Sequence, residues 1–95
     1  MVICLKYNNM KFRKRGLIVI TKYQSAAPIG SIVKIVKLMH TDTIVYKYNS
    51  FEGYYTNPRC CRLATEDEKK FRRKLLRRAG YNDIDYNINN MKHET

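Results

Sequence analysis

The sequence predicts one α+β domain, mostly β, in which a small antiparallel β-sheet or barrel is followed by a basic amphipathic C-terminal helix. A length of 95 residues fits one small domain. Segments rich in β-branched residues recur between short turns, and one later segment has helical spacing between capping signals. A hydrophobic content of 44% with 12% aromatic residues argues against intrinsic disorder, which requires few large apolar side chains.

Five segments are expected to be strands because β-branched and aromatic residues dominate them between turn residues. Gly16 opens the first, and Pro28 and Gly30 break regular structure before the second. The second segment also fits helical spacing, but four of its first six residues are β-branched, which favours a strand. Asn49-Ser50 and Glu52-Gly53 supply turns later on. The predicted strands are 17–23, 31–39, 43–48, 53–56 and 59–63.

The helix is predicted over 66–79 because both of its ends carry capping signals. Thr65 and Glu68 form a capping box, and Gly80 suits the position just beyond the helix. One apolar stripe faces a core and comprises Phe71, Leu75, Leu76 and Ala79. The last segment, 81–95, fits a helix by one spacing and a strand by another, so both alternatives stay open.

The formal net charge of +11, from 19 Lys and Arg against 8 Asp and Glu, indicates an acidic partner. The charge is uneven: 1–15 holds five basic residues and 69–78 holds seven, with no acid in either range. We therefore divide the chain into a basic N-terminal strand or arm (1–15), a barrel (16–64), a basic helix (65–80) and an Asn/Asp-rich tail that packs on the domain or is flexible (81–95).

Several other classes of protein are disfavoured. The apolar run 17–20 is too short to span a bilayer, and the first residues lack the pattern of a signal peptide. The odd cysteine count, from Cys4, Cys60 and Cys61, favours a reduced, cytoplasmic chain with buried structural thiols.

Metal binding and catalysis are also disfavoured. Cys60-Cys61 lacks zinc-ligand spacing, and neither His40 nor His93 has a ligand partner nearby in sequence. His40 with Asp42 could be a general base and its orienting group, but a surface histidine is the simpler reading. Without a phosphate loop or nucleophile motif, we expect no enzyme, cofactor or small-molecule substrate.

The middle of the chain resembles a known class of small domain. The carrying segments are Lys14-Arg15-Gly16-Leu17-Ile18-Val19-Ile20, Pro28-Ile29-Gly30-Ser31-Ile32-Val33-Lys34-Ile35, Ile44-Val45-Tyr46, Gly53-Tyr54-Tyr55-Thr56-Asn57-Pro58 and Arg62-Leu63-Ala64-Thr65-Glu66-Asp67-Glu68. They resemble SH3-like, KOW-like β-barrels, and the run into the helix resembles short phage-encoded accessory proteins. The resemblance implies RNA or protein binding, and modulation or neutralisation of a host system in the host cytoplasm.

The basic helix is the most specific functional feature of the sequence. At about 100° per residue, the cations opposite Phe71 and Leu75 form a ridge roughly 10 Å long that matches phosphate spacing. The alternative is that these bases only complement the helix dipole and keep the helix soluble. The ridge consists of Lys70, Arg73, Lys74 and Arg77.

A second basic cluster and several tyrosines could add to this surface. The cluster before the first strand either contacts nucleic acid with Phe12 interleaved or only blunts a sheet edge. Tyr54 and Tyr55 point to opposite sides of a strand, so one is expected to be exposed for base stacking, whereas at least one of Tyr46 and Tyr48 packs in the core. The candidate nucleic-acid-binding residues are Lys69, Lys70, Arg73, Lys74, Arg77 and Arg78 in the helix, Lys11, Arg13, Lys14 and Arg15 before the sheet, and Arg59, Arg62, Tyr54 and Tyr55 in it.

The function expected from these features is nucleic-acid binding, to RNA or single strands rather than a specific duplex. The sequence shows no helix-turn-helix, and its bases are dense, unlike the sparse base-reading residues of groove binders. The alternative is a protein-binding inhibitor or adaptor that docks its basic face on an acidic host protein, such as a toxin or nuclease. A host ribonucleoprotein would combine the two, and no membrane partner is expected.

Overall fold

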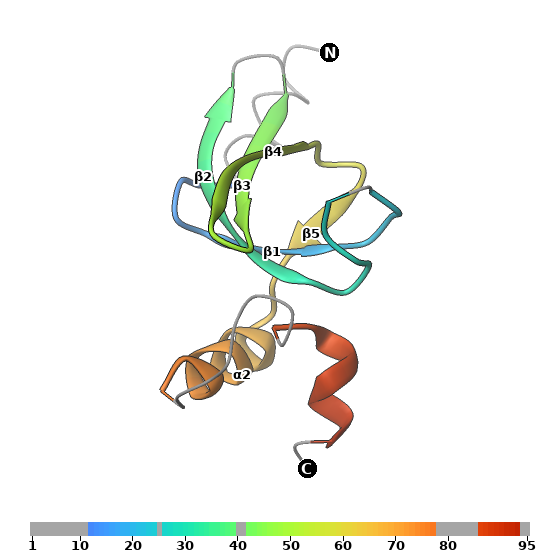
Figure 1. The fold of residues 1–95 in the computed structure, drawn as a ribbon, viewed down its shortest axis with the longest axis vertical. Coiled ribbons are helices and arrows are strands. Elements are labelled where there is room, and N and C mark those ends of the chain that lie inside the picture. Colours follow the sequence, from blue (N-terminus) through green and yellow to red (C-terminus); the bar gives the residue numbers. More distant parts are fainter. Residues whose placement is uncertain (1–11, 25, 40–41, 78–85, 94–95) are drawn as a thin grey trace.

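Five strands precede an α-helix and a short 3₁₀ helix in the computed structural model, which describes residues 12–24, 26–39, 42–77 and 86–93 (Figure 1). The elements are β1 Leu17–Ile20, β2 Ile32–Met39, β3 Thr43–Tyr48, β4 Phe51–Thr56, β5 Cys61–Leu63, α2 Glu66–Leu76 and η2 Ile88–His93. The predicted α+β class, with an antiparallel sheet ahead of one α-helix, is confirmed. Within the described residues no helix is long and apolar enough to cross a membrane.

The strands form a single antiparallel sheet in the order β4-β3-β2-β1-β5. β4 and β5 are its two edges and do not pair with each other in the described part of the chain, so the structure shows the predicted antiparallel sheet as an open ladder. The register between β2 and β3 shifts between Ile35 and Lys37. Such a bulge bends a strand and increases its local twist, so it curves the sheet without closing it.

The turn between β3 and β4 corrects one boundary prediction. Asn49 and Ser50, with φ of 52° and 70°, form the two-residue connection between Tyr48 and its partner Phe51. The predicted turn at Glu52-Gly53 is wrong, because both residues lie inside β4. Gly53 lies against an aromatic side chain: a Cβ at this position would lie 2.9 Å from the ring of exposed Phe51, and the ring would have to shift.

Two predicted strands are shorter in the structure by two residues or more. β1 ends at Ile20 instead of residue 23, and β5 begins at Cys61 instead of residue 59. The chain before β5 is turned instead, since the Cys60 amide donates to the Asn57 carbonyl at 3.0 Å and the Arg59 amide to the Asn57 side chain at 2.9 Å.

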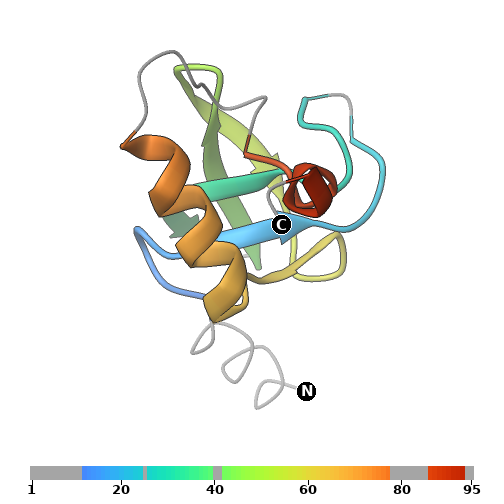
Figure 2. The same ribbon diagram turned by 90° about the horizontal axis from the view of Figure 1, so that it is seen from below.

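The two faces of the sheet bury separate hydrophobic clusters. β1 contributes to both, with Ile18 and Ile20 on one face and Val19 on the other. The larger cluster includes both Tyr46 and Tyr48, which confirms that this strand face packs in the core. Burial raises the pKa of the Tyr46 hydroxyl to about 12. The smaller cluster lies under α2 and η2, which therefore cover one side of the sheet (Figure 2).

The helix begins as predicted and ends earlier. The Glu68 amide donates to the Thr65 hydroxyl at 3.2 Å, and the Thr65 amide donates to the Glu68 carboxylate at 2.8 Å, so the capping box is confirmed. The helix ends at Leu76 instead of residue 79. Phe71 and Leu75 are buried as expected, but Leu76 is 54% exposed, so its assignment to the core-facing stripe is wrong. Ala79 and Gly80 lie outside the described residues.

The described part of the tail packs on the domain. It contains one isolated β-bridge and one 3₁₀ helix, so features of both the strand and the helix alternative occur in it. Asn87 forms an isolated antiparallel bridge with Ser31, and η2 follows it. The Ile32 amide donates to the Tyr86 carbonyl at 2.7 Å. Gly30, at φ 95°, allows this approach, since a Cβ there would lie 2.7 Å from the Asn87 side-chain oxygen.

Candidate nucleic-acid interface

The outer face of α2 is a continuous cationic surface. Four exposed side chains line one open hollow of about 460 Å³, and we name this set the helix ridge: Lys70, Arg73, Lys74 and Arg77. They lie together because positions three and four residues apart share one face of a helix. Phe71 and Leu75 are buried against the sheet, so the apolar side of α2 fixes the ridge outward as the spacing predicts.

Charges along α2 change sign from its start to its end. Glu66, Asp67 and Glu68 occupy the first turn, whereas Arg73 and Lys74 occupy the last, an arrangement that complements the helix dipole. Lys69, a candidate residue, lies beside these acids and its Nζ is 3.4 Å from Glu66 Oε2. The cationic surface therefore begins at Lys70 rather than at Lys69.

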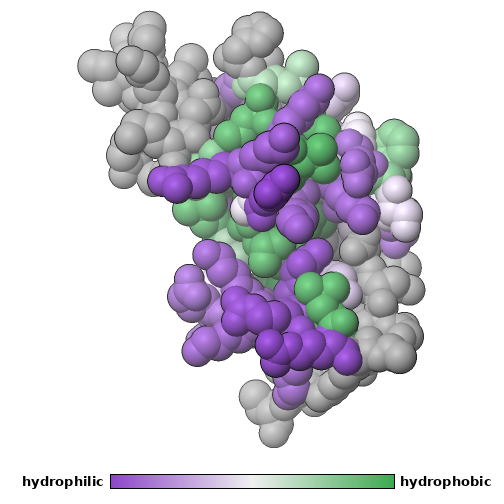
Figure 3. Space-filling view, turned by 90° about the vertical axis from the view of Figure 1, so that its left-hand side faces the viewer, coloured by the Kyte–Doolittle hydropathy of each residue, from purple (hydrophilic) through white to green (hydrophobic). Residues whose placement is uncertain are grey.

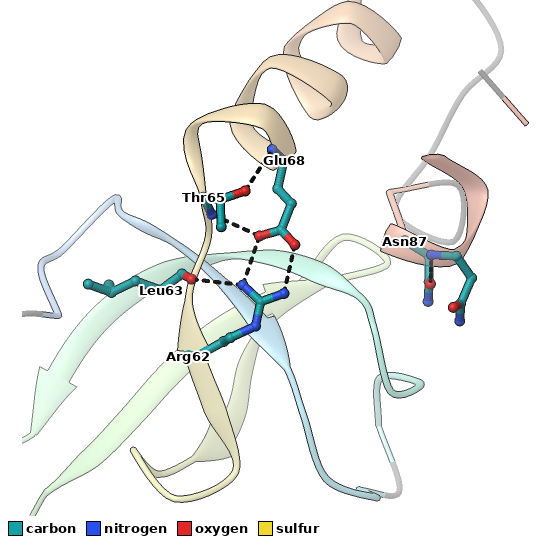
Figure 4. A network of polar contacts seen from close by, with 6 residues as sticks. Arg62, Leu63, Thr65, Glu68 and Asn87 are labelled. Atoms are coloured by element: carbon teal, nitrogen blue, oxygen red, sulfur yellow. Dashed lines mark hydrogen bonds and ion pairs between the residues drawn. The ribbon is translucent and has the colours of Figure 1, made fainter. Parts of the chain in front are cut away.

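A polar network fixes α2 to β5 (Figure 4). The Arg62 guanidinium donates to both Glu68 carboxylate oxygens, at 2.9 and 2.7 Å, and to the Leu63 carbonyl at 3.1 Å. The hydrogen bonds from Arg62 and then Thr65 outweigh burial and hold the pKa of Glu68 below its usual value, while the same carboxylate raises the pKa of Arg62. Arg62, a candidate contact residue, thus serves to orient the helix.

One turn after Glu68, the same side of α2 rests on the tail. The Arg72 guanidinium lies over the Tyr86 ring, 4.9 Å from its centroid, and Arg72 is half-buried. Such a cation–π contact joins α2 to the segment that leads into η2. The helix ridge is therefore carried by a helix that is held at β5 through Glu68 and at the tail through Arg72, one turn later.

A second cationic hollow, of about 370 Å³, lies where the turn before β1 meets β2 and β3. We name its four basic residues the sheet site: Lys14, Arg15, Lys34 and Lys47. Glu52 is the acidic residue in its lining. In the view of Figure 3, hydrophilic side chains gather above, towards the sheet, and below, over α2, on one side of the molecule.

Sequence reasoning missed Lys34 and Lys47. Each occupies a polar position in an otherwise apolar strand, in Val-Lys-Ile and Tyr-Lys-Tyr, and that alternation was the available signal. Their direct opposition across the β2–β3 ladder depends on register, which two strands acquire only on pairing.

The part of the arm that the structure describes, from Phe12 onward, is tied to the sheet. Phe12 is buried in the larger cluster, so it anchors the arm and is not exposed for base stacking. Arg13, Lys14 and Arg15 are exposed on the turn that follows. Lys11 in this arm lies outside the described residues, as does Arg78 at the other end of the candidate set.

The aromatic candidates on β4 differ in exposure, as predicted. Tyr54 is half-buried and packs edge-on against Phe51, with ring centroids 4.8 Å apart, and against Tyr46 at 5.8 Å. Tyr55 is 66% exposed and is the tyrosine of this pair available for stacking. Arg59 is exposed in the turn before β5 and lines neither cationic hollow.

The described cysteines are free thiols with different surroundings. Cys61 is buried in the larger cluster, where burial raises the pKa of its thiol to about 12. Cys60 is half-buried. Among the described residues, no three His, Cys, Asp or Glu side chains come together as metal ligands, and His40 lies outside these residues.

Comparison of the chain with protein-family models, with curated proteins and with solved structures finds no match in any of the three.

Proposed function

We propose that the chain binds single-stranded nucleic acid, RNA foremost, through the phosphates that contact the helix ridge. The observation that carries the proposal is the gathering of four exposed cations in one hollow on α2. Successive cations on one helix face are about 5 Å apart, which lets each contact a different phosphate group. Every such contact releases counterions, so this surface gains affinity without reading a base.

The composition of the exposed α2 face favours backbone contacts over sequence reading. α2 contains no Asn or Gln, the side chains that pair with adenine edges in a major groove. The basic residues of this face are Lys and Arg, and both side chains bind phosphate well. Tyr55, exposed on β4, adds a ring on which an unpaired base could stack.

The strand arrangement also supports an SH3-like barrel as the finer description of the fold. Its support is the order β4-β3-β2-β1-β5, in which β2 pairs with both β1 and β3, and the bulge after Ile35 that bends β2. In this proposal the two halves of the sheet fold towards each other around the larger cluster.

The second candidate function is docking on an acidic protein. The observation in its favour is the exposed edge strand β4, where Phe51 is 54% and Tyr55 66% exposed beside an unpaired strand edge. Aromatic residues are enriched in protein interfaces. A stoichiometric protein partner that is captured from host extract and withstands nuclease treatment supports this candidate.

The test of nucleic-acid binding is fluorescence anisotropy with a labelled single-stranded RNA at increasing salt. Four phosphate contacts give a log–log slope of about −3, at about −0.7 for each contact. Lys70→Gln with Arg73→Gln removes two contacts and is expected to weaken binding about 25-fold at about 0.1 M salt. Lys22→Gln with Lys37→Gln is the matched control, since both lysines are exposed and line neither hollow.

Two results contradict the proposal. A wild-type protein that does not bind RNA near about 0.1 M salt, or binds with a flat salt dependence, lacks the phosphate contacts. Equal weakening by the ridge variant and the control variant means that only total charge matters, and the helix ridge is then a solvated face.

A further inference from the structure

We infer that the sheet site is a second phosphate-binding site, and that one nucleic-acid strand runs from the helix ridge to it. This inference rests on the proposed function and adds Lys34 and Lys47 to the surface. The occupant we assign is the phosphate backbone of the same single strand.

The first support is the direct opposition of two like charges. Lys34 and Lys47 are paired residues on neighbouring strands, so their side chains leave the same face of the sheet a few ångströms apart. Opposed like charges destabilise a sheet. An anionic ligand between the two ammonium groups turns this repulsion into attraction.

The second support is the backbone of Arg15. The Gly16 amide donates to the Arg13 carbonyl at 2.9 Å, which makes a tight turn with Arg15 in its third position at φ 72°. This left-handed conformation favours glycine, and non-glycine residues held in it cluster at ligand-binding sites. Here it carries a guanidinium into the lining of the hollow.

The site is held rigidly by the sheet before any ligand arrives. The Arg15 amide donates to the Ile35 carbonyl at 2.8 Å, and the Ile35 amide donates to the Gly16 carbonyl at 2.8 Å. Buried Phe12 anchors the chain that enters the turn. Preorganisation of this kind reduces the entropy lost on binding.

Strand register places the sheet site beside the helix. Val19 pairs with Ile32, and both belong to the cluster under α2. Two residues along the same strands, on the same face, Leu17 pairs with Lys34. That step is about 7 Å, so Lys34 lies on the face that α2 covers, just beyond the apolar contact. The sheet site therefore belongs to the same side of the sheet as α2 and its helix ridge, which favours one ligand over two.

The charge and size of the hollow suit a phosphodiester. Four bases against Glu52 leave a net cationic lining, in a volume of about 370 Å³. This volume lies at the lower end of the range for small-ligand pockets. Guanidinium and ammonium groups converging from three elements are the chemistry that binds phosphate.

The experiment measures binding of wild type and Lys34→Gln/Lys47→Gln to single-stranded RNA of about 4 and about 16 nucleotides, lengths that bracket common single-strand sites. In wild type the long RNA is expected to bind far more tightly than the short one, because the second contact is made within one complex. The sheet-site variant is expected to lose about 25-fold for the long RNA at about 0.1 M salt, with a slope shallower by about 1.4. Lys22→Gln/Lys37→Gln is again the matched control.

Stability separates a lost ligand contact from a damaged fold. Since removal of opposed charges relieves repulsion, the sheet-site variant is expected to melt no lower than wild type while it binds RNA more weakly. A lower melting temperature contradicts the argument from the lysine pair.

The remaining outcomes separate failure of this inference from failure of the proposed function. If the ridge variant loses RNA binding and the sheet-site variant binds like wild type, the sheet site is overturned and the proposed function stands. If wild type binds no RNA, both are overturned. If polyglutamate binds as tightly as RNA, with the same dependence on Lys34 and Lys47, the occupant is an acidic protein segment and the assignment to nucleic acid is overturned.

Discussion

The carboxylate of Glu68 is the group whose removal tests most directly how the helix ridge is held in place. Glu68→Gln keeps the size of the side chain and removes the negative charge of the carboxylate, whose oxygens accept hydrogen bonds from Arg62 and Thr65. Hydrogen bonds to charged groups contribute about 1.5–3 kcal/mol each. Because the Arg62 side chain is 42% exposed and can rehydrate, and Gln retains one acceptor, we expect a total loss of about 2 kcal/mol.

The assay for this variant is thermal and urea unfolding followed by circular dichroism. A loss of about 2 kcal/mol lowers the melting temperature of a domain of this size by about 8–16 °C. The pKa of Glu68 is lowered in the folded state, so its stabilisation is present above the usual carboxyl pKa and is lost as the pH falls through the folded value. The stability difference between wild type and variant is therefore expected to be largest near neutral pH and to shrink below about pH 4.3.

Glu66→Gln is the control for this measurement. It removes the same charge from the same helical turn, but Glu66 is exposed. Its contact with Lys69, at 3.4 Å, is longer than the 2.7 Å contact between Arg62 and Glu68. Its cost is expected to stay below about 1 kcal/mol. Equal losses for the two variants, or a Glu68→Gln loss without pH dependence, would refute the role given to this network.

Three further predictions concern the packing of α2, of β5 and of the tail. Leu75→Ala is expected to cost about 2–5 kcal/mol because the side chain is buried, whereas Leu76→Ala costs less than about 1 kcal/mol; urea unfolding of both checks the helix orientation. The Cys61 thiol, with its pKa raised to about 12, stays protonated and should resist alkylation in the native protein at pH 8, while half-buried Cys60 reacts first; peptide mapping after iodoacetamide treatment shows the order. Gly30→Ala is expected to lower the free energy of unfolding by more than about 1 kcal/mol, because alanine is strained at a positive φ and its Cβ would clash with the Asn87 side chain. An unchanged melting temperature in thermal unfolding would contradict that contact.

Features encoded within a few residues could be predicted from the sequence. The Thr65–Glu68 capping box is such a feature, and the helix starts where it indicates. The clean alternation in β3 also identified Tyr46 and Tyr48 as one strand face. In each case neighbours along the chain decide the structure, so propensity and periodicity suffice.

Features decided by distant contacts could not be predicted. Glu52-Gly53 has turn composition, but the hairpin turns at Asn49 and Ser50, and β4 continues through the glycine at a point where its register with β3 shifts. The sheet site is the same kind of case, because Lys34 and Lys47 meet through strand register. Likewise Leu76 fits the spacing of the apolar stripe and is exposed, because tertiary packing decides how much of such a stripe is buried.

The bridge between Ser31 and Asn87 joins the sheet to a segment that is synthesised much later in the chain. The Asn87 side chain donates to the Ile29 carbonyl across 58 residues of sequence. The Ile32 amide donates to the Tyr86 carbonyl beside it. This contact needs Tyr86 and Asn87, so during synthesis it forms only after these residues have been made. During synthesis on a ribosome the sheet can assemble first, but α2 gains its Tyr86 support after the tail has been made. The contact between Arg72 of α2 and Tyr86 is therefore made only once the chain includes the tail.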